Sequence, residues 1–173
     1  MDEPRQCLES YLADHLAGSR GALELIAHLG DHAADDAIRS VMTELHEDVE
    51  FDRAALERIT RSIGGSMHPL REVSAWLAER ISRLKLGAGS GPVDGLAQFE
   101  AVETVALGII GKIKLWEVLL ASGAMGLDQA SLPGLRERAL EQHGRVERER
   151  QRLAAVIFRI QPERSAVVAG VAL

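Results

Sequence analysis

The chain has 173 residues, of which 46% are hydrophobic and 27% charged, while only 3% are aromatic. This length and balance exclude a disordered or fibrous chain and indicate a single domain spanning residues 1–173. The net charge of −6 argues against a nucleic-acid-binding protein, which normally has a concentrated basic face.

The composition favours helix over sheet. Alanine and leucine supply most of the apolar side chains, whereas β-branched and aromatic residues are scarce. The longest uncharged stretches fall short of the ~20 residues that span a bilayer, and the N-terminus lacks the basic and apolar regions of a secretory signal. We therefore expect an all-α, cytoplasmic protein without a membrane partner.

Five prolines predict where long helices begin, because proline is tolerated only in the first turn of a helix. The first helix is expected from about Pro4 to Leu29, ended by Gly30, and the second from about Ala33 to Ile63, ended by Gly64. A short crossover helix follows at about 69–86. The third bundle helix starts after Asp94 as N-cap and ends near Gly123, the fourth covers about 131–160, and residues 161–173 form a loose tail.

Apolar residues recur at spacings of three and four in each long segment, which predicts amphipathic helices. The third bundle helix is apolar over most of its circumference, so we expect it to be the most buried. Both the first and the third bundle helix contain Gly-x-x-Gly, at Gly18 and Gly21 and at Gly108 and Gly111, which predicts a close approach of their backbones.

The second and fourth bundle helices align with each other, which predicts an internal duplication. The alignment pairs His46 with His143, Asp52 with Glu149 and Arg53 with Arg150. The chain thus divides into two helical hairpins, joined by a crossover long enough to return along the bundle.

This organisation resembles the ferritin-like superfamily over about residues 5–160, as an antiparallel four-helix bundle with a short crossover helix. In that superfamily, metal-binding members place Glu on two helices and Glu-x-x-His on the other two. The chain departs from this pattern, because it contains no Glu-x-x-His. Glu44 and His46, like Glu141 and His143, are two residues apart and therefore point to nearly opposite faces of a helix.

The sequence accordingly predicts no metal and no cofactor. The alternative is an iron or manganese site with non-standard ligands. Its ligands would come from Asp52, Glu103, His143 and Glu149.

Several polar residues fall on the apolar stripes and are expected inside the bundle. Counting residues along the helices brings them to one layer, formed by Tyr11, Asp52, Lys112, Gln142 and Glu149. An unpaired aspartate at that depth is costly, so we predict a contact between Asp52 and Lys112. The same counting predicts a second cluster of Arg20, Glu103 and Arg150.

Two interpretations of the buried layer remain open. The preferred one is a polar device that fixes the helix register, as a polar residue does in coiled coils. The other is a binding pocket with Asp52, Lys112 and Glu149 as its charged floor. His15 lies on the inner seam of the first helix, where a histidine is most often an interior residue satisfied by its neighbours.

The sequence favours a non-catalytic structural or interaction protein, with a homodimer through an exposed bundle face as one arrangement open to it. A metal-binding oxidoreductase or storage protein is the first alternative. The second is a protein that binds a small apolar ligand between its helices.

Overall fold

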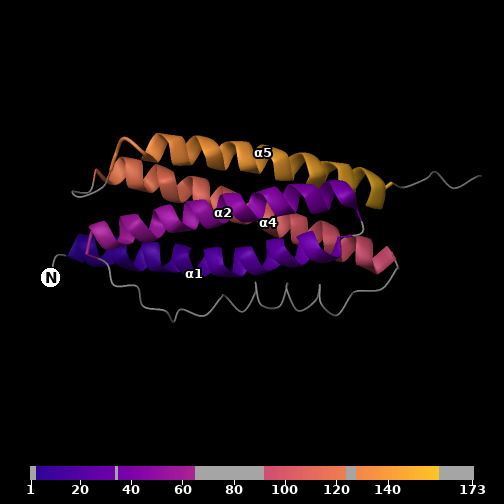
Figure 1. Cartoon of the computed structure of the whole chain (residues 1–173), viewed down its shortest axis with the longest axis horizontal. Helices are drawn as coiled ribbons and strands as arrows, with labels where there is room; N and C mark the ends of the chain where they lie inside the picture. The colour runs from indigo at the N-terminus through magenta and orange to yellow at the C-terminus, as the bar shows by residue number, and fades with distance from the viewer. Residues whose placement is uncertain (1–2, 34, 65–91, 124–127, 160–173) are drawn as a thin grey trace, which may run out of the picture.

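The computed structural model describes residues 3–33, 35–64, 92–123 and 128–159. Over these ranges it contains four helices and no strand: α1 (Glu3–His32), α2 (Asp36–Ser62), α4 (Pro92–Ser122) and α5 (Leu132–Ile157). This confirms the all-α prediction and agrees with a four-helix bundle (Figure 1). The predicted crossover helix at 69–86 and the tail at 161–173 lie outside the described residues.

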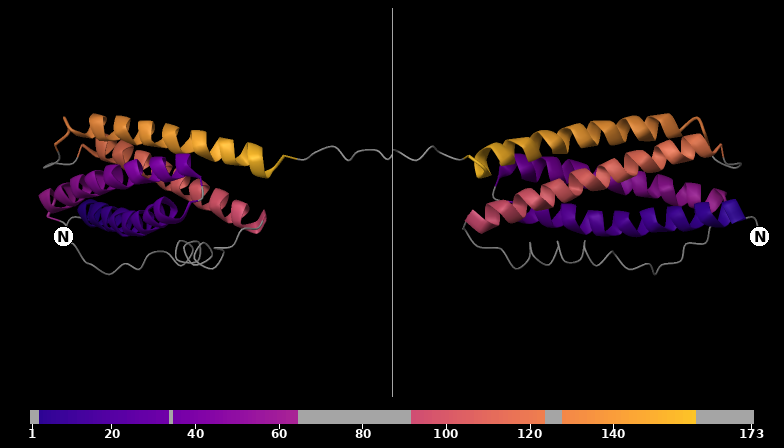
Figure 2. Two further views of the ribbon diagram at one scale, coloured as in Figure 1. Left: turned by 45° about the vertical axis from the view of Figure 1, so that its right-hand side comes forward. Right: turned by 180° about the vertical axis from the view of Figure 1, so that it is seen from behind.

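The four helices pack as two closely joined pairs. α1 contacts α2 and α4 contacts α5 extensively, whereas α1 with α4 and α2 with α5 contact each other less. Side-chain pairs between α2 and α5 join Asp35 to Arg152 and Asp52 to Arg138, so the two helices run in opposite directions. Seen from behind, α4 crosses the bundle obliquely, diverging from α1 at its pink end toward α5 at its salmon end (Figure 2).

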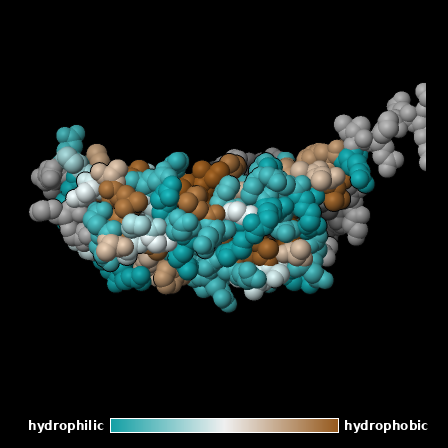
Figure 3. All heavy atoms as spheres, turned by 90° about the horizontal axis from the view of Figure 1, so that it is seen from above, coloured by the Kyte–Doolittle hydropathy of each residue, from teal (hydrophilic) through white to brown (hydrophobic). Residues whose placement is uncertain are grey.

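The core follows the predicted apolar stripes. The whole inner stripe of α2 is buried: Ile38, Met42, Leu45, Val49, Asp52, Leu56, Ile59 and Ile63. α4 is less completely buried than its composition predicted, because Leu107, Ile110 and Val118 are exposed on its outer face. The face over α5 is mainly hydrophilic, with separate hydrophobic patches (Figure 3). None of the helices described is long and apolar enough to cross a membrane.

Three predicted helix boundaries are wrong. α1 continues through Gly30 to His32, and Gly30 faces α2, where a Cβ would lie 3.8 Å from Thr43 Oγ1. α4 begins at Pro92, which is suited to the first turn, so Asp94 lies within that turn rather than before it. α5 ends at Ile157 instead of 160.

Other helix ends follow the expected chemistry. Asp35 caps α2, since its Oδ1 accepts hydrogen bonds from the backbone N–H groups of Ala37 at 2.9 Å and Ile38 at 3.2 Å. Gly64 and Gly123 follow α2 and α4 with φ of 76° and 55°. These are left-handed conformations that glycine adopts without steric cost, as the sequence predicted for the ends of these helices.

Candidate functional site

A buried polar triad joins three helices in the middle of the bundle. Lys112 Nζ on α4 donates to Asp52 Oδ2 on α2 at 2.6 Å, and Gln142 Nε2 on α5 donates to the same oxygen at 3.0 Å. Lys112 also donates to Gln142 Oε1, which closes the triad. The contact predicted between Asp52 and Lys112 is therefore present, and Gln142 lies in the same layer as predicted.

Burial decides the energetics of the triad. Asp52 and Gln142 are each 1% exposed, and the Lys112 side chain is 14% exposed. Two charges removed from water to this degree are tolerated only when paired and hydrogen-bonded. Burial lowers the pKa of Lys112 from its ordinary value, while the negative charge of Asp52 opposes that shift.

The triad continues into an ion-pair network between α2 and α5 that the sequence interpretation missed. Arg138 donates to Asp48 Oδ1 at 2.9 Å, and its Nε lies 3.6 Å from Asp52 Oδ1. Arg145 donates to the other oxygen of Asp48. The spacing of these residues along their helices could have indicated the network. Asp48 precedes Asp52 by one turn, Arg138 precedes Gln142 by four residues, and Arg145 follows it by three.

Two members of the predicted layer are placed differently. Glu149 is partly buried on α5, where its Oε2 accepts a hydrogen bond from Arg152 Nε at 2.7 Å. It follows Gln142 by two turns, and at a rise of 1.5 Å per residue this places it ~10 Å further along the bundle. Tyr11 lies beside the triad rather than in it: it lines the same cavity as Asp52 and Lys112. Its ring packs edge-on against His15, with ring centroids 4.7 Å apart, and it forms no hydrogen bond with Asp52 among the contacts described.

The second predicted cluster is present in part. Arg150 Nη1 on α5 lies 3.4 Å from Glu103 Oε1 on α4. The stronger partner of Arg150 is Glu147, one turn earlier, at 2.8 Å, and this contact lowers the pKa of Glu147 to about 2. Arg20 lies exposed on α1 and takes no part in these contacts, because its helix is diagonal to α5 in the bundle.

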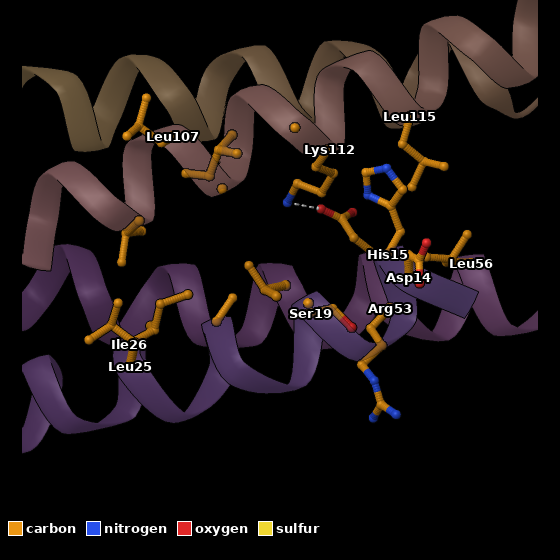
Figure 4. A pocket seen from close by; sticks show the side chains of 18 of the residues that line it. Asp14, His15, Ser19, Leu25, Ile26, Arg53, Leu56, Leu107, Lys112 and Leu115 are labelled. Atoms are coloured by element: carbon orange, nitrogen blue, oxygen red, sulfur yellow. Dashed lines mark hydrogen bonds and ion pairs between the residues drawn. The ribbon is translucent and has the colours of Figure 1, made fainter. Parts of the chain in front are cut away.

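A cavity of about 520 Å³ lies between α1 and α4 and extends down to α2; we call it the α1–α4 cavity. Its walls are mainly apolar, and Asp52 and Lys112 lie among its lining residues. In Figure 4 the Lys112 side chain extends from α4 to its ion pair with Asp52 of α2, marked by the dashed line. The apolar residues that line it include Leu25, Ile26, Val49, Leu56, Val105, Leu107, Ile109, Leu115 and Trp116.

Three glycines of α1 and α4 line this space. The sequence interpretation expected them to bring the two backbones together, and that expectation is wrong. A Cβ added at Gly18, Gly108 or Gly111 would meet nothing within 4 Å, and all three residues line the cavity. α4 diverges from α1 along the bundle (Figure 2), and the two helices border the cavity at these glycines instead of crossing tightly there.

Polar residues come from each wall of the cavity, and besides Asp52 and Lys112 they include Tyr11, Asp14, His15, Ser19, Arg53, Thr104 and Trp116. His15 extends from α1 toward α4 (Figure 4), and burial lowers its pKa below 6.5, which favours the neutral imidazole. The indole Nε1 of Trp116 is buried and has no hydrogen-bond acceptor in the described part of the chain. Ser19 lines the cavity while its hydroxyl donates to the Leu16 carbonyl at 2.8 Å.

The four residues considered as metal ligands do not converge. Asp52 is held by Lys112 and Gln142, Glu103 by Arg150, and Glu149 by Arg152. His143 lies partly exposed on α5. In the described ranges no group of three or more His, Cys, Asp or Glu side chains is arranged to hold a metal ion.

Comparison with known proteins adds no assignment: no family model, curated protein or solved structure matches the chain significantly.

Proposed function

We propose that the protein binds a small, mainly apolar molecule in the α1–α4 cavity, with the Asp52–Lys112 pair at the polar end of the ligand. The observation that carries the proposal is the cavity itself. Its volume of about 520 Å³ falls within the range of ~300–1,000 Å³ that is typical of small-molecule sites. The cavity opens to solvent past exposed lining residues such as Gly18 and Gly108, so a small molecule can enter it without a rearrangement of the helices.

The lining defines the class of ligand. Lys112 has three N–H donors and uses two, on Asp52 and Gln142, which leaves one without a partner among the described residues. The ion pair is neutral overall, so a neutral acceptor such as a carbonyl or hydroxyl oxygen suits it better than a second charge. The apolar residues that line the rest of the cavity favour a ligand whose remaining part is hydrocarbon or aromatic.

Glycine supports binding rather than packing as the role of this space. Glycine within a helix destabilises it by about 1 kcal/mol relative to alanine. Gly18, Gly108 and Gly111 incur that cost at positions where a side chain would meet no neighbour within 4 Å. Gly18 and Gly108 are exposed and Gly111 is partly buried, so a bound molecule could approach the backbone of both helices at these positions.

The experiment measures thermal unfolding with cinnamyl alcohol, a neutral molecule with an aromatic body and one hydroxyl. At a ligand concentration of ~100 Kd, binding to the folded state contributes ~2.7 kcal/mol, which raises Tm by roughly 5–10 °C for a domain of this size. We expect Gly108→Leu to abolish the shift by filling the cavity. Gly134→Leu on α5, where a Cβ also meets nothing within 4 Å, is the matched control and should keep the shift.

Two results would overturn the proposal. One is the absence of any Tm shift in the natural protein. The other is an equal shift in the natural protein and in both the Gly108→Leu and Gly111→Leu variants, since binding would then occur elsewhere on the surface.

For the ancestry of the fold, we propose a ferritin-like bundle that has lost its metal ligands. The support is the pairing of α1 with α2 and of α4 with α5, together with the long segment between the two pairs. The internal duplication stays part of this proposal, because it rests on the alignment of α2 with α5.

A further inference from the structure

We infer that Lys112 is a nucleophile, and that the ligands of the α1–α4 cavity include aldehydes, which it captures as an imine. The inference rests on the proposed function, because it requires that the cavity admit a small apolar molecule. It goes further by naming a carbonyl carbon as the group presented to Lys112 and by assigning a covalent step to the site.

The position of Lys112 carries the inference. Its side chain is 14% exposed and lines an apolar cavity, whereas Lys114, two residues later, is 65% exposed and pairs with Glu117 at the surface. Desolvation of a lysine in an apolar pocket favours the uncharged amine, which is the nucleophilic form. The lowered pKa of Lys112 agrees with this environment.

Charged groups from the neighbouring helices act on Lys112 in opposite directions. Asp52 and Asp48 on α2 favour the ammonium form, and Arg138 on α5 disfavours it. On α1, burial favours the neutral imidazole of His15, whereas Asp14 on α1 and Arg53 on α2 bring one charge of each sign to the cavity lining. Asp52 is therefore the one carboxylate that forms a direct hydrogen bond with the Lys112 amine.

Asp52 supplies the proton transfers that imine formation needs. Its Oδ2 lies 2.6 Å from Nζ and accepts a proton from the ammonium. The free amine then attacks the carbonyl carbon, a C–N bond forms, and one proton moves from nitrogen to the carbonyl oxygen to give a carbinolamine. Asp52 returns its proton to that hydroxyl, which leaves as water, and the nitrogen remains as a protonated imine.

The charges balance before and after the reaction. One ammonium and one aldehyde give one protonated imine and one water, with no oxidant or reductant. Asp52 ends as a carboxylate beside a cation, as it began, and Gln142 keeps its hydrogen bond to Oδ2 at 3.0 Å. The buried ion pair therefore survives the reaction, so the step adds no new unpaired charge to the interior.

The test is reductive trapping with cinnamaldehyde and cyanoborohydride at pH 7, followed by peptide mass spectrometry. The chain has three lysines, Lys85, Lys112 and Lys114, so each site of labelling is readily assigned. We expect label at Lys112 to exceed that at Lys114 by at least about tenfold, through confinement and desolvation. Lys114→Arg should leave this labelling unchanged, whereas Gly108→Leu should abolish it and leave label at Lys114.

Cinnamyl alcohol separates the two proposals, because it has the same shape but no carbonyl carbon. If the alcohol binds and the aldehyde labels Lys112 no faster than Lys114, the nucleophile inference is wrong and the proposed function stands. If neither compound binds, both are wrong. Asp52→Asn supplies a further readout: selective labelling at an undiminished rate in this variant would overturn the assigned proton transfers.

Discussion

Removing Lys112 should destabilise the protein far more than removing its exposed neighbour Lys114. The Lys112→Met variant leaves Asp52, which is 1% exposed, with the Gln142 amide as its close donor. Removing one partner of a buried ion pair costs about 3–5 kcal/mol. The partial exposure of Lys112 and the Arg138 guanidinium 3.6 Å from Asp52 Oδ1 favour the lower limit, ~3 kcal/mol, or about 6–12 °C in Tm.

A double-mutant cycle completes the experiment. In Asp52→Leu with Lys112→Met no buried charge is left unpaired, so the double variant should lose less stability than either single variant. A residual cost of ~1 kcal/mol remains, because the Gln142 amide loses both partners. Urea unfolding at pH 7 measures all four species, and Lys114→Met, whose ion pair is exposed, should change stability by less than ~0.5 kcal/mol.

Additive effects of the two single substitutions would refute this reasoning, since the charges would then not be coupled. The same double variant tests whether the triad fixes the helix register. A register device predicts that the amide NMR spectrum of the double variant broadens or doubles. A single sharp set of resonances would leave the cavity floor as the remaining role of the pair.

Three further outcomes follow from the site and its surroundings. Burial lowers the pKa of His15 below 6.5, so on acidification the imidazole is protonated in the unfolded chain before it is protonated in the folded protein. The free energy of unfolding should therefore decrease as the pH drops below 6.5, and it should decrease less steeply in His15→Gln. Urea unfolding at several pH values measures both. Glu147, held by Arg150, should titrate by carboxyl NMR near its pKa of about 2, and Arg150→Met should raise that midpoint toward 4.5; a midpoint that does not move would exclude Arg150 as the cause. Asp35→Ala should cost ~1–2 kcal/mol in urea unfolding through loss of the α2 cap, whereas Asp36→Ala, at an exposed position, should cost less than ~0.5 kcal/mol.

Local sequence rules predicted the helices and the centre of the polar layer because both depend on short-range geometry. The period of 3.6 residues placed Asp52 and Gln142 on inner faces, and residue counting brought Lys112 to the same height. The same counting carried Glu149 into the layer, although it lies two turns away from Gln142. Periodicity fixes which face a residue occupies, but its height depends on the register of each helix against its neighbour.

The network around Asp48 was missed for a different reason. Arginine on a helix is usually solvated, and Arg138 and Arg145 could each have pointed to solvent without violating any local rule. Only the packing of α2 against α5 brings both guanidinium groups to one carboxylate. The i, i+4 spacing of Asp48 and Asp52 was a visible signal, since two acids on one inner face require cations from the facing helix.

The glycines of α1 and α4 are a pattern whose structural outcome could not be predicted from the sequence. A Gly-x-x-Gly pair permits two helices to approach closely, yet the same absence of side chains leaves a hollow when the helices diverge. Which outcome occurs depends on the inclination of α4, which contacts α5 far more extensively than it contacts α1. An oblique α4 brings Lys112 to the base of the hollow and leaves Gly108 and Gly111 in its wall. The cavity and its reactive amine therefore have a single structural origin, and the most direct way to separate them is to fill the wall at Gly108 while leaving Lys112 in place.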